Sequence, residues 1–184
     1  MQEVSVIIPN FNGMAYLDGV LAGLECQTVN NFEVILVDNG SSDGSCAFVS
    51  ARYPWVHLIE LPENFGFCKA VNEGIKASRA PYVLLLNNDI EVTENFIEEM
   101  ISAIRRHPKA FSCAARMIQF HDRDKLDDAG NYYCALGWAY ARGKGKDIHT
   151  YEKEEKIFAS CAGAAIYRKK IFDKIGLFDE EHFA

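Results

Sequence analysis

The stretch YVLLLNNDIEV, residues 82–92, runs the most apolar strand of the sequence into its most polar triplet. Residues 82–86 carry no charged side chain, which predicts a strand buried on both faces of a sheet. Asn87, Asn88 and Asp89 follow directly. Ligands of open parallel α/β sheets bind beyond the carboxyl ends of the strands, so we expect these three side chains to lie at a binding site.

Short apolar runs alternate with helical periodicity up to Pro108. Three further runs predict strands, at residues 4–9, 32–38 and 56–61. The intervening segments predict helices, at residues 15–27, 46–54, 67–78 and 93–108. In the last helix we expect Thr93 to be the N-cap, with an apolar stripe of Phe96, Met100, Ile101 and Ile104. The alternation predicts an α/β fold, with a Rossmann-like, mostly parallel sheet and helices on both faces.

The rhythm changes near residue 110. Residues 110–118 predict a strand, residues 121–156 are rich in loop formers, and residues 157–176 predict a strand that runs into a short helix. The sequence ends abruptly on an apolar and acidic pattern, GLFDEEHFA. We therefore expect the natural protein to continue past Ala184.

Composition excludes several classes of function. The chain has 184 residues, of which 49% are hydrophobic, enough for one well-buried domain. Its net charge of −7 gives no general attraction to nucleic acid. No apolar run reaches the roughly 18 residues of a candidate membrane-spanning helix, so we expect no membrane span in this chain. The six cysteines lack zinc-site spacing and indicate free thiols in a reducing, cytoplasmic compartment.

Each predicted parallel strand is followed by a polar loop. These loops are PNFNG at 9–13, DNGSSDG at 38–44, PENFGF at 62–67 and NNDIE at 87–91. Because the carboxyl ends of parallel strands meet at one edge of the sheet, the four loops are expected to form one crevice.

Asp38, in the second of these loops, and Lys69, in the helix predicted at residues 67–78, each have a functional and a structural interpretation. Asp38 would accept hydrogen bonds from a nucleotide base or ribose, or it would simply shape a turn. Lys69 would face a diphosphate near a helix N-terminus, where backbone N–H groups also favour anions, or it would lie in solvent.

Asp89 is the sharper case. A carboxylate placed after a buried strand costs free energy unless it is paired, solvated or bound to a metal. A single aspartate with asparagine neighbours suits Mg²⁺ or Mn²⁺, which accept oxygen ligands and commonly share them with substrate phosphates. An N-cap role for Asp89 in the next helix is the alternative.

Taken together, these segments resemble a family 2 glycosyltransferase with the GT-A fold. The resemblance rests on VSVIIPNFNG, FEVILVDNGSSDGS, NFGFCKAVNEGI, YVLLLNNDIEV and SCAGAAIYRKKIFDKIGLFDE, which occur in the family's order. The segment DDAG at 127–130 makes the chain most similar to rhamnosyltransferase-like members that build bacterial surface polysaccharides. The resemblance implies a single GT-A domain, with residues 1–109 as the nucleotide-binding half and 110–184 as an incomplete acceptor-side half.

The resemblance also implies a nucleotide-diphosphate sugar as donor. Pro9, Phe11 and Asn12 would line the nucleoside pocket, Asp38 would hold the base or ribose, and Lys69 would lie near the base and diphosphate. Asn87, Asn88 and Asp89 occupy the family's DxD position, with Asp89 matching the metal-binding aspartate. Asn87 replaces the first acid, so a two-carboxylate metal site is not expected.

The reaction implied by the resemblance is inverting transfer to the hydroxyl of a saccharide or lipid-linked saccharide, at the inner face of the membrane. The family's catalytic base lies in an acidic pair beyond the point where this sequence ends, and Glu180 and Glu181 come too early to match it. The catalytic residue is therefore unknown, and we expect this chain to bind nucleotide but transfer sugar poorly.

Other classes of protein fit less well. The first strand is followed by PNFNGM and not by GxGxxG, which counts against a dehydrogenase, and GxxxxGK[ST] is absent. A non-catalytic nucleotide-sugar-binding module and a sugar-nucleotide pyrophosphorylase-like domain remain as alternatives.

Overall fold

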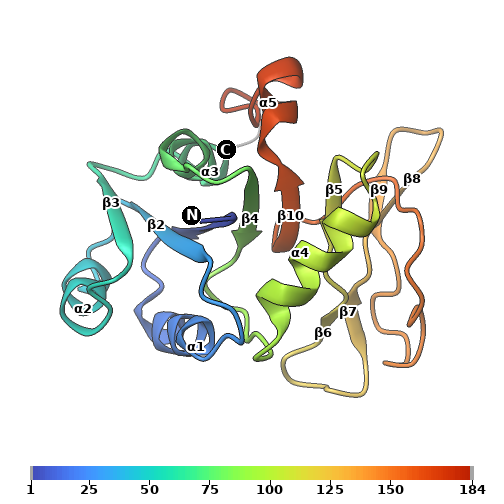
Figure 1. Ribbon diagram of the computed structural model, residues 1–184, viewed down its shortest axis with the longest axis horizontal. Coiled ribbons are helices and arrows are strands. Elements are labelled where there is room, and N and C mark those ends of the chain that lie inside the picture. Colours follow the sequence, from blue (N-terminus) through green and yellow to red (C-terminus); the bar gives the residue numbers. More distant parts are fainter. Residues whose placement is uncertain (1, 183–184) are drawn as a thin grey trace.

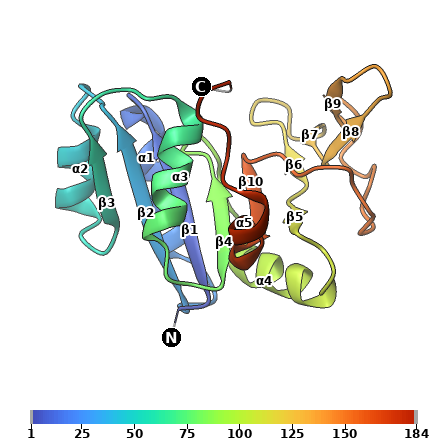
Figure 2. The same ribbon diagram turned by 90° about the horizontal axis from the view of Figure 1, so that it is seen from above.

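The computed structural model describes residues 2–182, and its centre is a six-stranded sheet (Figures 1 and 2). The expected continuation past Ala184 falls outside these residues. The sheet order is β3-β2-β1-β4-β10-β5. Four strands are parallel: β1 Val4–Asn10, β2 Phe32–Asn39, β3 His57–Leu61 and β4 Tyr82–Leu86. The strand β10, Ala164–Arg168, runs antiparallel between β4 and β5, Ser112–Ala114.

Helices cover both faces of this sheet because successive strand residues point to opposite sides. The helices are α1 Met14–Glu25, α2 Ser45–Arg52, α3 Phe67–Ala77, α4 Phe96–Arg106 and α5 Lys169–Ile175. In β1, Ile8 packs in the core formed with α1, α2 and α4, whereas Ile7 packs against α3 and α5. Figure 1 shows the two layers of helices on either side of the sheet. The predicted mostly parallel α/β fold is confirmed.

The start of α4 differs from the sequence prediction. Its N-cap is Asn95, and the hydroxyl of Thr93 donates a hydrogen bond to the side chain of Asn95, 3.0 Å away. The free N–H of Ile97 is instead bound by Oε1 of Gln27, at 2.8 Å, from the chain that leaves α1. The prediction of Thr93 as N-cap is therefore wrong, because a side chain distant in sequence satisfies the helix end.

The predicted strand over residues 110–118 is also wrong as a single element. Residues 112–114 form β5 and pair with β10, whereas β6, Met117–Ile118, pairs with β7, Leu126–Asp128, in a separate sheet. The chain changes partner between them, since the N–H of Ala115 binds the carbonyl oxygen of Ala164 at 2.9 Å. The single apolar run at residues 110–118 is thus divided into two strands, because β5 pairs with β10 and β6 pairs with β7.

The remaining strands are short. β8, Asn131–Tyr133, and β9, Ala139–Ala141, form a two-stranded sheet of their own. They lie in the loop-rich region that the sequence predicts. Among residues 2–182, no helix has the length and apolar character needed to cross a membrane.

Candidate functional site

The ends of β1, β2 and β4 are joined through one side chain, Asn10. Asn10 is the last residue of β1 and is 2% exposed. Its Nδ2 donates to Oδ1 of Asp38 at 2.8 Å and lies 3.2 Å from Oγ of Ser45. Its Oδ1 accepts a hydrogen bond from Nδ2 of Asn88 at 2.7 Å. Three of the four predicted loops therefore meet at this carboxamide.

Asp38, the second-last residue of β2, lies at the centre of this network. Besides the bond from Asn10, its Oδ2 accepts the backbone N–H of Ser41 at 2.8 Å. Burial acts to raise the pKa of Asp38, but hydrogen bonds from Ser41, Asn10 and Cys46 outweigh it and hold the pKa below its usual value. Asp38 is thus an ionised carboxylate that shapes the loop following β2.

Several hydrogen bonds join the loops that follow β1 and β2. The backbone N–H of Asn12 donates to Oγ of Ser41 at 2.8 Å, and Oδ1 of Asn12 accepts the N–H of Ser42 at 2.9 Å. Asp43 accepts the N–H of Met14 at 2.9 Å. Pro9 is half-buried and Phe11 is 48% exposed beside them. Asn12 and the buried Asp38 are therefore linked through Ser41, and Pro9 and Phe11 adjoin Asn12 in the sequence.

Gly13 allows these loops to approach one another. A Cβ placed on Gly13 would lie 2.1 Å from Nδ2 of Asn88 and 2.3 Å from Oδ1 of Asn10. Both distances are far inside van der Waals contact, so a side chain at this position would displace the hydrogen bond between Asn88 and Asn10.

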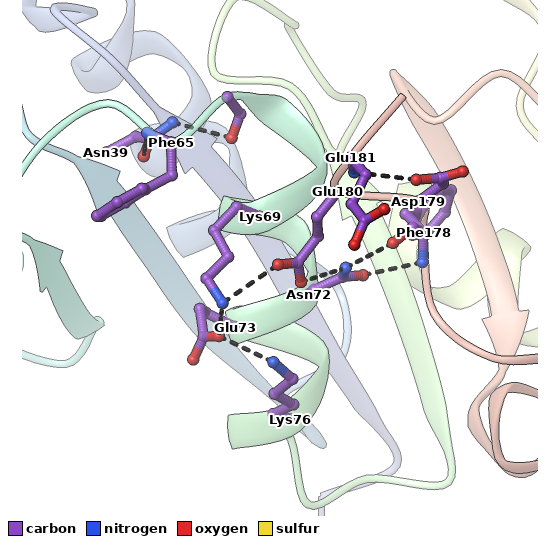
Figure 3. Close-up of polar contacts among 11 residues, drawn as sticks. Asn39, Phe65, Lys69, Asn72, Glu73, Lys76, Phe178, Asp179, Glu180 and Glu181 are labelled. Carbon is purple, nitrogen blue, oxygen red and sulfur yellow. Dashed lines mark hydrogen bonds and ion pairs between the residues drawn. The ribbon is translucent and has the colours of Figure 1, made fainter. Parts of the chain in front are cut away.

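A second buried carboxamide, Asn39, ties β2 to the loop before α3. Its Nδ2 donates to Oδ1 of Asn64 at 2.8 Å and to the carbonyl oxygen of Gly66 at 3.0 Å. Its Oδ1 accepts the N–H of Phe65 at 3.0 Å, as Figure 3 shows. Asn39 is 4% exposed, and it brings the fourth predicted loop beside the other three.

Lys69 lies on the first turn of α3 but has partners of its own. Its Nζ is 3.1 Å from Oε1 of Glu73 and 3.2 Å from Oε2 of Glu180 (Figure 3). These carboxylates raise the pKa of Lys69, with Glu73 the larger cause. About a third of the side chain is exposed. The structure therefore places Lys69 against the segment that follows α5 and not in the hydrogen-bond network of Asn10.

Asn72, one turn further along α3, fastens that segment. Its Nδ2 donates to the carbonyl oxygen of Phe178 at 2.8 Å, and its Oδ1 accepts the N–H of Phe178 at 3.0 Å. Nδ2 also donates to Oε1 of Glu180 at 2.8 Å. Figure 3 shows these bonds on the side of α3 that faces Asp179 and Glu181. Asn72 is 1% exposed, so it holds the chain end against the helix.

The triplet after β4 shows how a divalent cation would fit. Asp89 is exposed, and Asn87 and Asn88 are half-buried. Within residues 2–182, no group of three or more histidine, cysteine, aspartate or glutamate side chains is placed to hold a metal. One carboxylate with neighbouring carboxamide oxygens fits Mg²⁺ or Mn²⁺ only when substrate phosphates supply further ligands. The residues present therefore fit a cation that binds together with a nucleotide.

Two cavities lie away from this network. One of about 780 Å³ lies between the end of α4, β5 and residues 151–157. The other, of about 340 Å³, is lined by residues around β5 and the end of α5. Neither of these two cavities is lined by the predicted site residues.

Six residues that hold these loops together were not among the predicted site residues, and Asp43 and Asn64 are two of them. The other four are Asn10, Asn39, Ser41 and Ser45. The sequence carried one usable signal, a polar residue at the last position of a buried strand, which both Asn10 and Asn39 satisfy. Asn10 and Asp38 are also register partners in β1 and β2, a pairing that only the sheet defines.

The sequence model of the family described as Glycosyl transferase family 2 matches residues 5–176. The chain is 25% identical over 201 residues to an N-acetylglucosaminyl-diphospho-decaprenol L-rhamnosyltransferase of Mycobacterium tuberculosis, covering 97% of this chain and 65% of that protein. It is 30% identical over 133 residues to Glycosyltransferase GlyG of Streptococcus pneumoniae, covering 71% and 42%. This chain thus spans only part of the length of these relatives.

Solved structures give the same fold. S. aureus TarS in complex with UDP superposes with a TM-score of 0.71 at 22% identity, over 98% of this chain and 51% of that one. A mannosyltransferase of Pyrobaculum calidifontis, in complex with GDP-Man and Mn²⁺, gives 0.69 at 15% identity, over 97% and 48%. At these identities the likeness concerns the fold alone.

Proposed function

The chain belongs to glycosyl transferase family 2, and on that premise we propose that it transfers a sugar from a nucleotide-diphosphate sugar to an acceptor hydroxyl. Its sheet and helices have the GT-A fold. The observation that carries the proposal is the family match over residues 5–176, which includes all four polar loops and β10. Because the chain spans only part of its relatives, the activity is proposed for the whole protein.

The donor is proposed to bind across the loops that follow β1 and β2. Pro9, Phe11 and Asn12 would contact the nucleoside. Asp38 would act on the base or ribose, either directly or by holding the loop from Ser41 in place. Its low pKa supports both roles, because an ionised carboxylate accepts hydrogen bonds only. Residues 1–109 then form the nucleotide-binding half and residues 110–184 the acceptor-side half.

The diphosphate is proposed to lie near Asn87, Asn88 and Asp89, with Asp89 as the protein's carboxylate ligand to Mg²⁺ or Mn²⁺. When bound, such a cation would neutralise charge on the leaving diphosphate. Asn88 is already oriented by its bond to Asn10, so the triplet is fixed relative to β1. Lys69 would reach an anionic ligand only by giving up part of its pairing with Glu180.

The chemistry is proposed to be inverting displacement. A carboxylate base removes the proton of the acceptor hydroxyl as that oxygen bonds to the anomeric carbon. The bond from that carbon to the diphosphate oxygen breaks, and the diphosphate leaves with the electron pair. Glu180 and Glu181 are not assigned as the base, since Glu180 is engaged by Asn72 and Lys69.

The acceptor is proposed to be a saccharide or a lipid-linked saccharide in bacterial surface polysaccharide synthesis. Support comes from the relative in Mycobacterium tuberculosis, whose name specifies a diphospho-decaprenol acceptor. The reaction would take place in the cytoplasm at the inner face of the membrane, where such lipid carriers are accessible.

Calorimetry with UDP, dTDP and GDP, each with and without Mn²⁺, tests the proposed donor site. We expect one nucleotide to bind the native chain more tightly when Mn²⁺ is present. Asp89→Ala should abolish that gain, whereas Asp173→Ala, which removes an exposed carboxylate of α5, should preserve it. If no nucleotide binds the native chain, the proposed function is wrong.

Transfer assays on the full-length protein separate an enzyme from a binding module. We expect turnover of one nucleotide sugar by the full-length protein and little turnover by residues 1–184. Nucleotide binding without turnover by the full-length protein would instead support a non-catalytic nucleotide-sugar-binding module.

A further inference from the structure

The ribbon formed by β8 and β9 projects from the end of the molecule opposite to β3 (Figures 1 and 2). Tyr132 pairs with Tyr140 across it, and Tyr133 pairs with Ala139. A tight turn closes the ribbon, because the N–H of Cys134 binds the carbonyl oxygen of Trp138 at 2.9 Å. Figure 2 shows β8 and β9 well outside the layer that β4 and β10 occupy.

The ribbon exposes large apolar side chains at its tip. Leu136 is 81% exposed and Trp138 is 71% exposed. These are high fractions for a chain whose main cores bury their leucines completely, as at Leu36 and Leu84. Single exposed apolar residues are ordinary, but contiguous apolar patches mark interaction sites.

Aromatic rings also cover both faces of the ribbon. Tyr132 and Tyr140 lie together on one face, with ring centroids 5.3 Å apart. Tyr133 lies on the other face, because neighbouring strand residues alternate, and stacks on Phe158 at 4.9 Å. Phe158 is itself 70% exposed. Tyr133 and Tyr140 are each more than half exposed, so a ring on either face of the ribbon remains accessible.

Charged side chains are absent from the tip of the ribbon and occur only after β9. Residues 129–146 contain no aspartate or glutamate, in a chain with a net charge of −7. Their cations, Arg142, Lys144 and Lys146, all follow β9. Arg142 is buried against Glu155 and the ring of Tyr151. Lys144 has 66% of its side chain exposed and pairs with Asp127 at 3.2 Å. Lys146 is exposed, and its Nζ donates to the hydroxyl of Tyr151 at 3.0 Å. Two solvent-exposed ammonium groups therefore lie at the base of an uncharged tip, and the partner of Lys146 is a neutral hydroxyl.

We propose that the β8–β9 ribbon docks the protein onto a lipid bilayer. Leu136 and Trp138 enter the interfacial region, and Lys144 and Lys146 lie at the level of the lipid phosphates. Tryptophan and tyrosine favour this region because their rings combine an apolar body with a polar atom. The proposal goes beyond the proposed function, and rests on it only in that a lipid-linked acceptor would lie in the same bilayer.

Two other occupants fit these observations less well. A flat protein surface would cover one face of the ribbon and leave the rings of the other face in water. A saccharide requires hydrogen-bonding side chains beside the aromatic rings, and residues 132–141 offer mainly tyrosine hydroxyls for this purpose. A bilayer interface contacts both faces and the tip together, and its phosphates complement Lys144 and Lys146.

The chain contains only two tryptophans, Trp55 and Trp138, which makes the test direct. In Trp55→Phe, Trp138 is the single reporter. We expect its emission to shift to shorter wavelength when vesicles of phosphatidylcholine and phosphatidylglycerol are added, and to be quenched by brominated acyl chains. In Trp138→Phe, the emission of Trp55 should remain unchanged. A Trp138 signal that vesicles do not alter overturns the proposal.

Vesicle flotation of the native chain and its variants provides the matched comparison. The double variant Leu136→Ser with Trp138→Ser should weaken binding by at least about tenfold, because two large apolar side chains are lost from the interface. Ile175→Ser, at a residue of α5 that is 64% exposed, should bind like the native chain. Equal binding by the double variant and the native chain overturns the proposal.

Two further measurements test whether a second copy of the chain or a saccharide binds the ribbon instead of a bilayer. If the native chain sediments as a dimer without vesicles, and the double variant as a monomer, then the ribbon is an interface between copies and the proposal is wrong. A Trp138 emission shift caused by soluble saccharides alone would overturn it in the same way. None of these measurements contains a nucleotide, so their outcome is independent of the calorimetric test of the donor site.

Discussion

The ammonium group of Lys69 lies 3.2 Å from a carboxylate oxygen of Glu180, and this contact joins α3 to the segment that follows α5. The residue proposed to approach a diphosphate is therefore already paired, and Glu73 shares it. An anionic ligand at Lys69 would compete with Glu180. The strength of this ion pair is thus expected to set part of the affinity for nucleotides.

Glu180→Gln removes the charge that competes for Lys69 but retains an oxygen that accepts the hydrogen bond of Asn72. We expect UDP to bind more tightly by about twofold to fivefold, because an exposed ion pair is weak in water. Binding of uridine, which lacks the diphosphate, should stay unchanged. Calorimetry with both ligands measures the difference.

Glu181→Gln is the matched control, since it removes the same charge from the neighbouring residue, which has no ion pair to Lys69. If Glu180→Gln and Glu181→Gln increase the affinity for UDP equally, the effect is one of net charge. Lys69 would then not be a ligand of the diphosphate.

Asn72→Ala should detach the segment around Phe178 from α3. The substitution removes both hydrogen bonds to the backbone of Phe178 from a residue that is 1% exposed. We expect the free energy of unfolding to fall by about 2 kcal/mol, as for buried polar groups that lose their partners. Urea denaturation measures this change, and limited proteolysis should cleave residues 177–182 faster. Asn30→Ala, at an exposed asparagine, should do neither.

Gly13→Ala tests the contact between the loops after β1 and β4. The added methyl group overlaps Asn88 and Asn10, so we expect a loss of about 1–3 kcal/mol in stability and weaker nucleotide binding. Gly19→Ala is the control, because a Cβ at Gly19 in α1 meets no atom within 4 Å. It should stabilise the protein by about 0.5–1 kcal/mol, since alanine favours helices. Equal effects of the two substitutions would contradict the geometry of the loops.

The stability that Asp38 contributes should depend on pH in a defined direction. Its pKa is lower in the folded protein than the usual 3.8, so the contribution is fully present above that value and is lost as pH falls through the folded pKa. Asp38→Asn should lower the free energy of unfolding by about 2 kcal/mol at neutral pH. Denaturation curves at several pH values should show this difference narrowing below about pH 4. A difference that stays constant with pH would show that Asp38 is not ionised.

Local patterns predicted the elements whose ends are set locally. The strand over residues 82–86 is observed at the predicted residues, because a continuous apolar run is bounded by polar residues on the carboxyl side. The predicted N-cap of α4 was wrong because a residue distant in sequence binds the start of this helix. Gln27, 70 positions away from Ile97, binds the helix end, and no local signal reports such a contact.

In the site, too, features set by local sequence were predicted and contacts between distant segments were not. The rule that parallel strands direct their carboxyl ends to one edge was enough to bring Asn12, Asp38 and Asn88 into one hydrogen-bonded group. The pairing of Lys69 with Glu180 was beyond prediction, because Glu180 reaches α3 only after the chain has formed β10 and α5. Strand tips could thus be predicted from the sequence, whereas the pairing of a helix with a later segment required the fold.

The antiparallel pairing of β5 with β10 has a consequence for diversification within the family. Ala115 and Ala164, which are hydrogen-bonded neighbours, mark where the chain leaves the central sheet and where it returns. The 48 residues between them contribute no strand to the six-stranded sheet, so we expect changes in their length to leave its register intact. On the proposed function, exchanging this segment between relatives and assaying a range of acceptors would test whether it carries the acceptor preference.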